Sequence, residues 1–218
     1  MSKTNIIIYR MTHIENIPHI LENGITHKNS LNSNPHYRNI GDLSLIDNRS
    51  QKEVSVDNGN YLNLNPKKIT LGNFIPFYFG IRMPMLYTAQ IGGNFVENAT
   101  SPESIIYLAC SVDSIIGFGH EYYFSDGHAT NNYSSFYDSS KIADINNILD
   151  WSAIKSNYWG GNENLNTKRK KQAEFLILGD INIDNIVGFG CYNEDAKNKL
   201  IQYGVKDLQI KVIPNGYF

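Results

Sequence analysis

The sequence predicts a mixed α+β fold with largely antiparallel sheets. The chain has 218 residues, of which 41% are hydrophobic and 18% charged, and this composition suits one folded domain spanning residues 1–218. Short runs rich in β-branched and aromatic residues predict several strands. Helical segments lie between some of these strands without the regular alternation of a doubly wound fold, so a mixed α+β architecture is favoured.

The N-terminal part predicts a strand followed by a short helix. Residues 5–10 (NIIIYR) carry three consecutive isoleucines, which are typical of a buried strand. A helix to about Glu22 should follow. It can begin at Thr12, which forms an S/T-x-x-E capping box with Glu15, or at Asn16, which places a proline in the first turn.

Residues 28–72 form a long polar stretch that is rich in Asn, Ser, Asp and Lys and sparse in apolar residues. Structureless segments of this length are uncommon in compact domains and are usually functional or disordered. We therefore expect a loop–helix insertion that closes over a ligand.

The rest of the chain predicts further short elements. Strands are expected at residues 74–79, 104–112, 122–124, 172–178, 186–191 and 208–213. Helices are expected at residues 151–159, with Asp150 as cap, and 194–202, while residues 84–89 begin a helix or a strand.

Charge and cysteine content exclude several classes of protein. The formal net charge is −2 and the pI about 6.3, so any nucleic-acid contact must come from a local basic patch. Cys110 and Cys191 lie in no metal-binding spacing, and no metal is expected. The N-terminal apolar run is too short for a signal peptide or a membrane span, so we expect a soluble cytoplasmic protein without membrane contact.

Three residues are candidates for chemistry, each with a plainer alternative. His13 lies where a strand meets a helix, a place from which it can reach a ligand or merely satisfy backbone groups. Arg49 carries a permanent, forked charge suited to phosphate or carboxylate, but it can equally be a solvated surface arginine. Glu174 is an isolated carboxylate early in an apolar strand, which indicates a catalytic acid or base unless it faces solvent from an edge strand.

Two further segments could contact a ligand. Lys168, Arg169, Lys170 and Lys171 run directly toward the strand that carries Glu174. Such a run is most often a solvated turn, although beside a cleft it can hold a phosphate backbone. His128 follows Ser125-Asp126-Gly127, which predicts a turn that presents the imidazole or an ordinary surface turn.

Four motifs, in order along the chain, resemble the DarT family of toxin–antitoxin systems. They are YRMTHIENI from Tyr9, Arg49 ahead of Val54, PFYF from Pro76 with PMLY from Pro84, and KR with QAEFL from Lys168. The surroundings of Arg49 diverge from the family pattern. The resemblance otherwise covers almost the whole chain, and the PFYF…PMLY and KR..QAEFL pair is its most specific part.

The resemblance implies an ADP-ribosyltransferase fold, with two packed, mainly antiparallel sheets around an NAD cleft and helices on the flanks. It implies transfer of ADP-ribose from NAD, as co-substrate, to a base in single-stranded DNA, with release of nicotinamide. Glu174 and Arg49 would be catalytic. Residues expected to contact NAD are Thr12, His13, Tyr9, Arg49 and Tyr87, and those expected to contact DNA are Lys168, Arg169, Lys170, Lys171 and His128.

The resemblance also implies a toxin with a cognate antitoxin that reverses or blocks the modification. Residues 80–83, before Pro84, look closer to members that modify guanine than to those that modify thymine, so guanine is slightly favoured. Two other functions fit the same sequence: an ADP-ribosyltransferase that acts on RNA or protein, and a catalytically silent module that binds single-stranded nucleic acid.

Overall fold

The computed structural model describes residues 5–56, 62, 64–92, 96 and 98–218. The strands in these residues are β1 (Ile7–His13), β2 (Glu53–Val56), β3 (Lys67–Thr70), β4 (Phe74–Tyr78), β5 (Ile105–Ser111), β6 (Tyr122–Ser125), β7 (Phe136–Tyr137), β8 (Glu174–Leu178), β9 (Ile186–Cys191) and β10 (Ile210–Val212). The α-helices are α1 (Ile17–Asn23), α2 (Leu43–Gln51), α3 (Pro84–Ile91), α4 (Val112–Gly117), α5 (Ile145–Ile148), α6 (Trp151–Lys155), α7 (Leu165–Lys171) and α8 (Glu194–Gln202).

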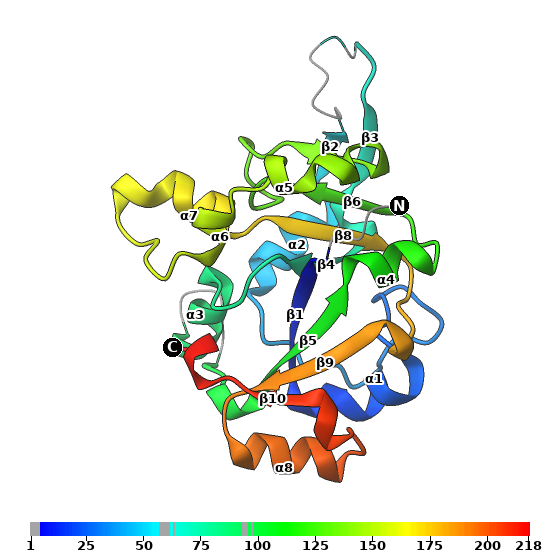
Figure 1. Ribbon diagram of the computed structural model, residues 1–218, viewed down its shortest axis with the longest axis vertical. Helices are drawn as coiled ribbons and strands as arrows, with labels where there is room; N and C mark the ends of the chain where they lie inside the picture. The colour runs from blue at the N-terminus through cyan, green and yellow to red at the C-terminus, as the bar shows by residue number, and fades with distance from the viewer. Residues whose placement is uncertain (1–4, 57–61, 63, 93–95, 97) are drawn as a thin grey trace.

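Across the described residues the strands join in the order β10-β9-β5-β1-β4-β8-β6-β7-β2-β3. The pairs β9–β10 and β2–β7 are parallel and the others antiparallel. β1 and β4 are in register at a single pair, Tyr9 with Tyr78, whereas β4 and β8 are in register at five. The sheet thus divides at β1–β4 into two halves whose strands run in clearly different directions (Figure 1). The predicted α+β class with largely antiparallel sheets is confirmed.

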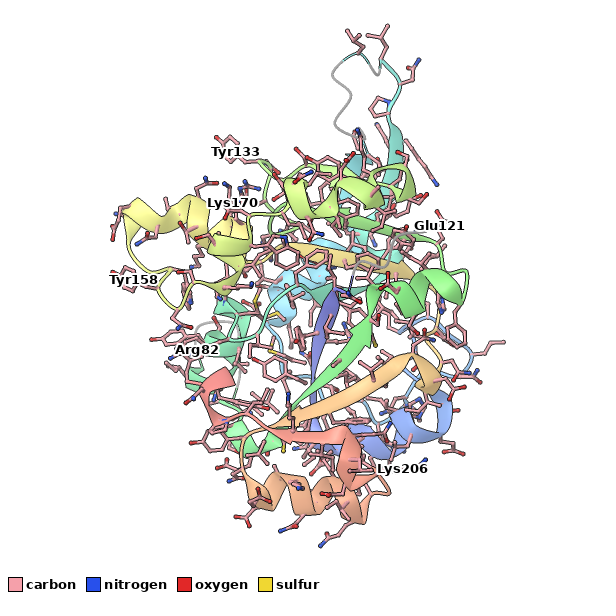
Figure 2. The ribbon with its side chains drawn as sticks, viewed as in Figure 1. Arg82, Glu121, Tyr133, Tyr158, Lys170 and Lys206 are labelled. Carbon is pink, nitrogen blue, oxygen red and sulfur yellow. The ribbon has the colours of Figure 1, made fainter. Side chains whose placement is uncertain are left out.

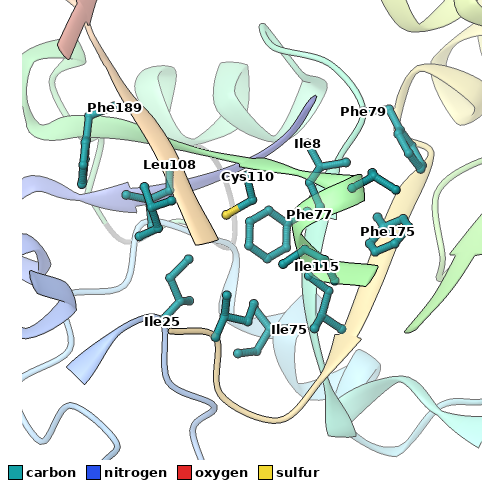
Figure 3. Packing of buried hydrophobic residues seen from close by; sticks show 14 of the residues in the cluster. Ile8, Ile25, Ile75, Phe77, Phe79, Leu108, Cys110, Ile115, Phe175 and Phe189 are labelled. Atoms are coloured by element: carbon teal, nitrogen blue, oxygen red, sulfur yellow. The ribbon is translucent and has the colours of Figure 1, made fainter. Parts of the chain in front are cut away.

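The main core fills the space between the central strands and the helices. Phe77 of β4, Leu108 of β5 and Phe175 of β8 have no exposed surface, and they belong to one cluster with Ile115 of α4 and further aliphatic side chains (Figure 3). Burying one such side chain stabilises the fold by about 1.5–3 kcal/mol. This core holds β4 and β8 rigidly side by side, and β8 begins with Glu174.

The stretch 28–72 is more regular than expected. It contains α2, in line with the predicted loop–helix insertion, but also β2 and β3, which extend one end of the sheet. Asp42 caps α2, because its Oδ1 accepts hydrogen bonds from the amides of Ser44 and Leu45. No residue of α2 is buried, so this helix lies over the body of the protein as a cover.

Several elements differ from the sequence predictions. The basic run was expected to lead straight into a strand, but it forms the end of α7, because leucine, lysine and arginine favour helix when packing does not oppose it. Asp150 caps α6 as predicted, although the helix ends at Lys155. Helix α8 has the bounds that the sequence predicted.

Candidate active site

The Glu174 carboxylate is completely buried yet fully paired. Its Oε2 accepts a hydrogen bond of 2.7 Å from Arg49 Nη1, and its Oε1 accepts one of 2.8 Å from the amide of Ala129. The amide of Glu174 donates to Ser125 Oγ at 3.2 Å, which fixes the start of β8 against the end of β6. A buried charge needs such partners, and their arrangement holds the carboxylate in one orientation.

Arg49 reaches Glu174 from the last turn of α2, across 125 positions of sequence. Its Nε and Nη2 are buried and make no hydrogen bond within the described part of the chain. Buried donors are nearly always satisfied by an acceptor. Two buried guanidinium donors without a partner among the described residues therefore indicate that a ligand supplies the acceptor oxygens. A phosphate or a ribose offers oxygens that suit this fork.

Arg49 forms part of the wall of a cavity of about 420 Å³, here called cleft A. The other lining residues used below are Arg10, Thr12, Asn16, Asn34, Tyr37, Leu43 and Ile46. The volume is within the range of small-molecule sites, and the walls combine apolar side chains with a few polar groups.

Strand alternation decides which residues of β1 reach cleft A. Thr12 lines it, and so does Arg10, which shares that face of the strand. Tyr9 and His13 have the opposite parity and do not line it. Tyr9 packs edge-on against Tyr107, and His13 Nδ1 accepts a hydrogen bond from the amide of Glu15. The structure therefore brings Thr12 and Arg49 together but not Tyr9 and His13. Arg10 was missed, although its parity with Thr12 could have indicated it.

Asn16, which has no exposed surface, links β1 to the rim of cleft A. Its Nδ2 donates to Thr12 Oγ1 at 3.0 Å and to the Arg38 carbonyl at 2.9 Å. Its Oδ1 accepts from the Arg38 amide at 2.8 Å. One buried amide thus fixes both Thr12 and the rim. As one of the two sequence predictions has it, α1 begins after Asn16 with a proline in its first turn, but the Asn16 side chain makes no capping hydrogen bond, and its role beside Thr12 was not predicted.

A second cavity, of about 770 Å³ and here called cleft B, lies between α3, α7 and the turn after β6. Its lining includes Tyr87, His128, Tyr133, Trp159, Lys168 and Arg169. Tyr133 and Tyr158 are widely exposed on the same side of the molecule as Lys170 (Figure 2). Tyr87 was expected beside NAD with Thr12 and Arg49, but it lies in this second cleft.

His128 lines cleft B from the turn that donates the Ala129 amide to Glu174. Burial lowers the pKa of His128, and the nearby Glu174 carboxylate partly opposes this shift. Its Nδ1 is 3.0 Å from Thr130 Oγ1. The turn that the sequence predicted before His128 therefore presents the imidazole to cleft B, as proposed.

The four basic residues of α7 have different surroundings. Lys168 is exposed, and its Nζ lies 5.4 Å from the centre of the Trp159 ring. Arg169 pairs with Asp126 at 3.0 Å and Lys170 with Asp150 at 2.9 Å. Lys171 is 2% exposed and donates to the Ile154 carbonyl. Arg169, Lys170 and Lys171 already have partners within the protein, so among these four residues we propose a contact with DNA only for Lys168. His128 also remains a proposed DNA contact, because it lines the same cleft.

The burial of Lys171 can be tested through the pH dependence of the free energy of unfolding. Desolvation, assisted by the Arg82 charge, lowers the pKa of Lys171 from 10.5 to about 8. Below pH 8 both folded and unfolded chains carry the charge, and its burial cost is fully present. Between pH 8 and 10.5 the unfolded chain binds more protons, so stability rises with pH. Relative to Lys171→Met, the wild type should therefore gain free energy of unfolding from pH 7.5 to pH 10, measured by urea unfolding. Parallel pH curves for the two proteins would contradict this burial.

Two kinds of site are absent from the described residues. No three or more His, Cys, Asp or Glu side chains there are arranged to hold a metal ion. No helix in the same residues is long and apolar enough to cross a bilayer.

Comparison with known proteins identifies the family. Residues 9–218 match the family model described as ssDNA thymidine ADP-ribosyltransferase, DarT. A DNA ADP-ribosyl transferase of Escherichia coli O127:H6 is 29% identical over 198 residues, which cover 90% of this chain and 85% of that protein. Another, from Thermus sp. (strain 2.9), is 31% identical over 173 residues, covering 78% and 73%. A DNA ADP-ribosyl transferase–DNA ADP-ribosyl glycohydrolase fusion protein of Thermosipho africanus is 27% identical over 212 residues, covering 97% of this chain and 48% of the fusion.

Solved structures have the same fold. Thermus sp. 2.9 DarT in complex with ADP-ribosylated ssDNA superposes with a TM-score of 0.80 and 24% identity, covering 98% of this chain and 97% of that one. The same protein in complex with NAD+ gives a TM-score of 0.76, also at 24% identity, with full coverage of both chains. The predicted ADP-ribosyltransferase-like fold is confirmed. Because the family model covers nearly all of the sequence, this chain belongs to the DarT family of DNA ADP-ribosyltransferases.

Proposed function

We propose that this chain transfers ADP-ribose from NAD to a base in single-stranded DNA, releases nicotinamide, and uses Glu174 and Arg49 as its catalytic pair. The observation that carries the proposal is the completely buried Glu174 carboxylate, paired with an arginine whose two remaining buried donors have no partner in the described residues. Such a charge arrangement is costly to stability and is typical of a functional site.

Cleft A suits NAD. Arg49 Nε and Nη2 would donate to oxygens of the dinucleotide, and the polar side chains of Thr12 and Asn34 offer further hydrogen bonds. Leu43 and Ile46 of α2 supply apolar surface. Since α2 has no buried residue, a ligand that packs against it would also order it.

Cleft B suits single-stranded DNA. Tyr133 and Trp159 offer faces on which bases can stack, and Lys168 adds an exposed positive charge beside Trp159. The net charge of −2 rules out a uniformly basic binding surface, so a contact with nucleic acid needs a local basic patch. Lys168 beside Trp159 provides one.

The roles of the two catalytic residues follow from their partners. NAD supplies the ADP-ribosyl group and nicotinamide as the leaving group. Glu174 presents a fixed negative charge, which favours the positive charge that builds on the ribose as the glycosidic bond breaks. It also accepts the proton from the attacking base nitrogen. Arg49 and the Ala129 amide hold the carboxylate in place throughout.

Two indications about the acceptor base point in different directions. Residues 80–83 favour guanine on the sequence resemblance, whereas the family model is described for thymidine. Residues 80–83 are not among those that line cleft B, although Pro84 is. The guanine proposal predicts labelling of oligonucleotides that contain guanine and lack thymine.

A toxin role with a cognate antitoxin is the second part of the proposal. The relative from Thermosipho africanus joins a transferase to a DNA ADP-ribosyl glycohydrolase in one chain, and such a partner would remove the modification. This chain matches about half of that fusion. We therefore propose that a DNA ADP-ribosyl glycohydrolase activity serves as its antitoxin.

The test is incubation with NAD and a panel of single-stranded oligonucleotides, each lacking one base, followed by mass spectrometry. The expected product is one oligonucleotide plus one ADP-ribose. Labelling of RNA or protein instead would favour those acceptors. NAD at 100 times the Kd of a true site would stabilise the protein by about 2.7 kcal/mol, so the absence of any thermal stabilisation by millimolar NAD would indicate a silent binding module.

A further inference from the structure

The turn of residues 126–129, here called the site turn, connects the two clefts. It donates the Ala129 amide to Glu174 and presents His128 to cleft B. Ser125, just before it, donates to the Gly127 carbonyl at 2.6 Å and accepts from the amide of Glu174. A shift of this turn would therefore move the histidine and the donor on the carboxylate together.

Arg169 holds the site turn from α7. Its Nη1 donates to Asp126 Oδ1 at 3.0 Å and to Ser134 Oγ at 3.3 Å, and its carbonyl accepts from the amide of His128 at 2.9 Å. The arginine side chain is 10% exposed. Asp126 Oδ1 also accepts a hydrogen bond from the amide of Ser135, so the carboxylate joins the two ends of the segment 126–135. One residue thus contacts both ends of the turn.

Gly127 makes room for this arrangement. A Cβ atom added at Gly127 would overlap with Arg169 Nη1 and lie 2.8 Å from Ser134 Oγ. The guanidinium therefore rests directly on the backbone of the turn, and any side chain at position 127 would push it away from Asp126. The backbone of Gly127 needs no left-handed conformation, so the effect of a side chain at position 127 would be to displace Arg169 and Ser134 from their present contacts.

The same contacts argue against a phosphate role for Arg169. Its charge is already matched by Asp126 in a mostly buried pair, and a DNA phosphate would have to break that pair. Lys168, one residue earlier, is exposed and makes no ion pair in the described part of the chain. Lys168 is therefore free to contact a phosphate, whereas Arg169 holds the site turn, although both residues line cleft B.

We propose that Arg169 is a positioning residue: it fixes the site turn, and through it His128 and the Ala129 amide that orients Glu174. The proposal rests on the proposed function, in which Glu174 is catalytic. Misplacing a catalytic group by about 1 Å can cost 10²-fold in rate. Arg169→Ala should therefore lower kcat for transfer to an oligonucleotide by about 10–100-fold, with a much smaller change in KM for DNA.

Salt dependence separates positioning from phosphate binding. Each contact to a single-stranded phosphate contributes about 0.7 to the slope of log affinity against log salt concentration. Lys168→Ala should reduce that slope by about this amount, measured by fluorescence anisotropy with a labelled oligonucleotide. Arg169→Ala should leave the slope at its wild-type value. A slope that falls equally in both variants would overturn the proposal.

Two further variants keep the test decisive if Arg169→Ala folds poorly. Gly127→Ala retains both charges and should reproduce the loss in kcat, and adding Arg169→Ala to it should cause little further loss. Arg169→Lys can pair with Asp126 but lacks the Nε donor that Arg169 directs to Asn166, so it should recover kcat only in part. Wild-type kcat in Gly127→Ala, or complete recovery by lysine, would contradict positioning.

A measurement without turnover separates this proposal from the proposed function. The ring resonances of His128 in an NMR spectrum at fixed pH should shift in Arg169→Ala and in Gly127→Ala, but not in Lys206→Ala, an exposed lysine that lines neither cleft and lies far from Tyr133 and Lys170 (Figure 2). This holds even if no oligonucleotide is labelled by the wild type, a result that would sink only the proposed function. Unshifted His128 resonances in both variants would refute the role of Arg169.

Discussion

Glu174→Gln should reduce ADP-ribose transfer to single-stranded DNA by about 10³-fold, because the substitution removes the fixed negative charge from a water-excluded site. An amide also cannot satisfy both neighbours. Arg49 Nη1 and the Ala129 amide are donors, so the glutamine NH2 must face one of them. This conflict should lower the free energy of unfolding by about 1–3 kcal/mol and leave the protein folded.

Mass spectrometry of an oligonucleotide incubated with NAD measures the transfer, and circular dichroism checks the fold. Glu121→Gln is the matched control. Glu121 lies next to β6 on the opposite side of the molecule from Tyr158, and its carboxylate is exposed (Figure 2). Transfer by Glu174→Gln above a tenth of the wild-type rate would show that the carboxylate is structural.

Arg49→Ala should lower transfer by about 10²–10³-fold and weaken NAD binding without abolishing it. The truncation removes the cation beside a buried carboxylate, a change that costs up to 3–5 kcal/mol when no water enters. Arg49 is 16% exposed toward cleft A, so water can replace it and the cost should be smaller. Loss of Nε and Nη2 removes the donors that we assign to NAD, while Thr12 and the apolar wall of α2 remain.

Arg49→Lys divides these two contributions. Lysine keeps a charge that can pair with Glu174, but it has no planar fork to serve a second acceptor. Its stability should approach that of the wild type, while the rise in melting temperature caused by NAD should remain reduced. Unchanged turnover in Arg49→Ala would mean that Arg49 is an ordinary residue of the α2 cover.

Most of the strands, with β2, β3 and β7 as exceptions, and the place of Glu174 in β8 were predictable because they depend on local pattern. The apolar residues after Glu174 predicted β8, and the stretch from Glu194 to Gln202 predicted α8. The pairing of Arg49 with Glu174 could not be derived from composition or periodicity, since 125 positions separate the two residues. The resemblance to a family implied only that both residues are catalytic, and the structure places them in direct contact.

Other parts of the site were beyond the sequence because they depend on tertiary packing. The Ala129 amide that donates to Glu174 belongs to the backbone and has no signature in the sequence. The run from Lys168 to Lys171 looked uniform, yet the helix turns each side chain toward a different neighbour. Which of these four side chains is buried and which is exposed depends on how α7 packs against the rest of the protein, and the sequence does not show that packing.

The position of Glu174 between the clefts has a thermodynamic consequence. The same carboxylate holds Arg49, which lines cleft A, and influences His128, which lines cleft B. A ligand in cleft A that draws Arg49 away from Glu174 alters the electrostatic field that the Glu174 carboxylate exerts on His128 in cleft B. Reciprocity then requires that whatever factor the donor substrate applies to acceptor affinity, the acceptor applies to donor affinity. The two substrates of this chain are thereby linked through one shared anion, in addition to the contact that the transfer itself requires.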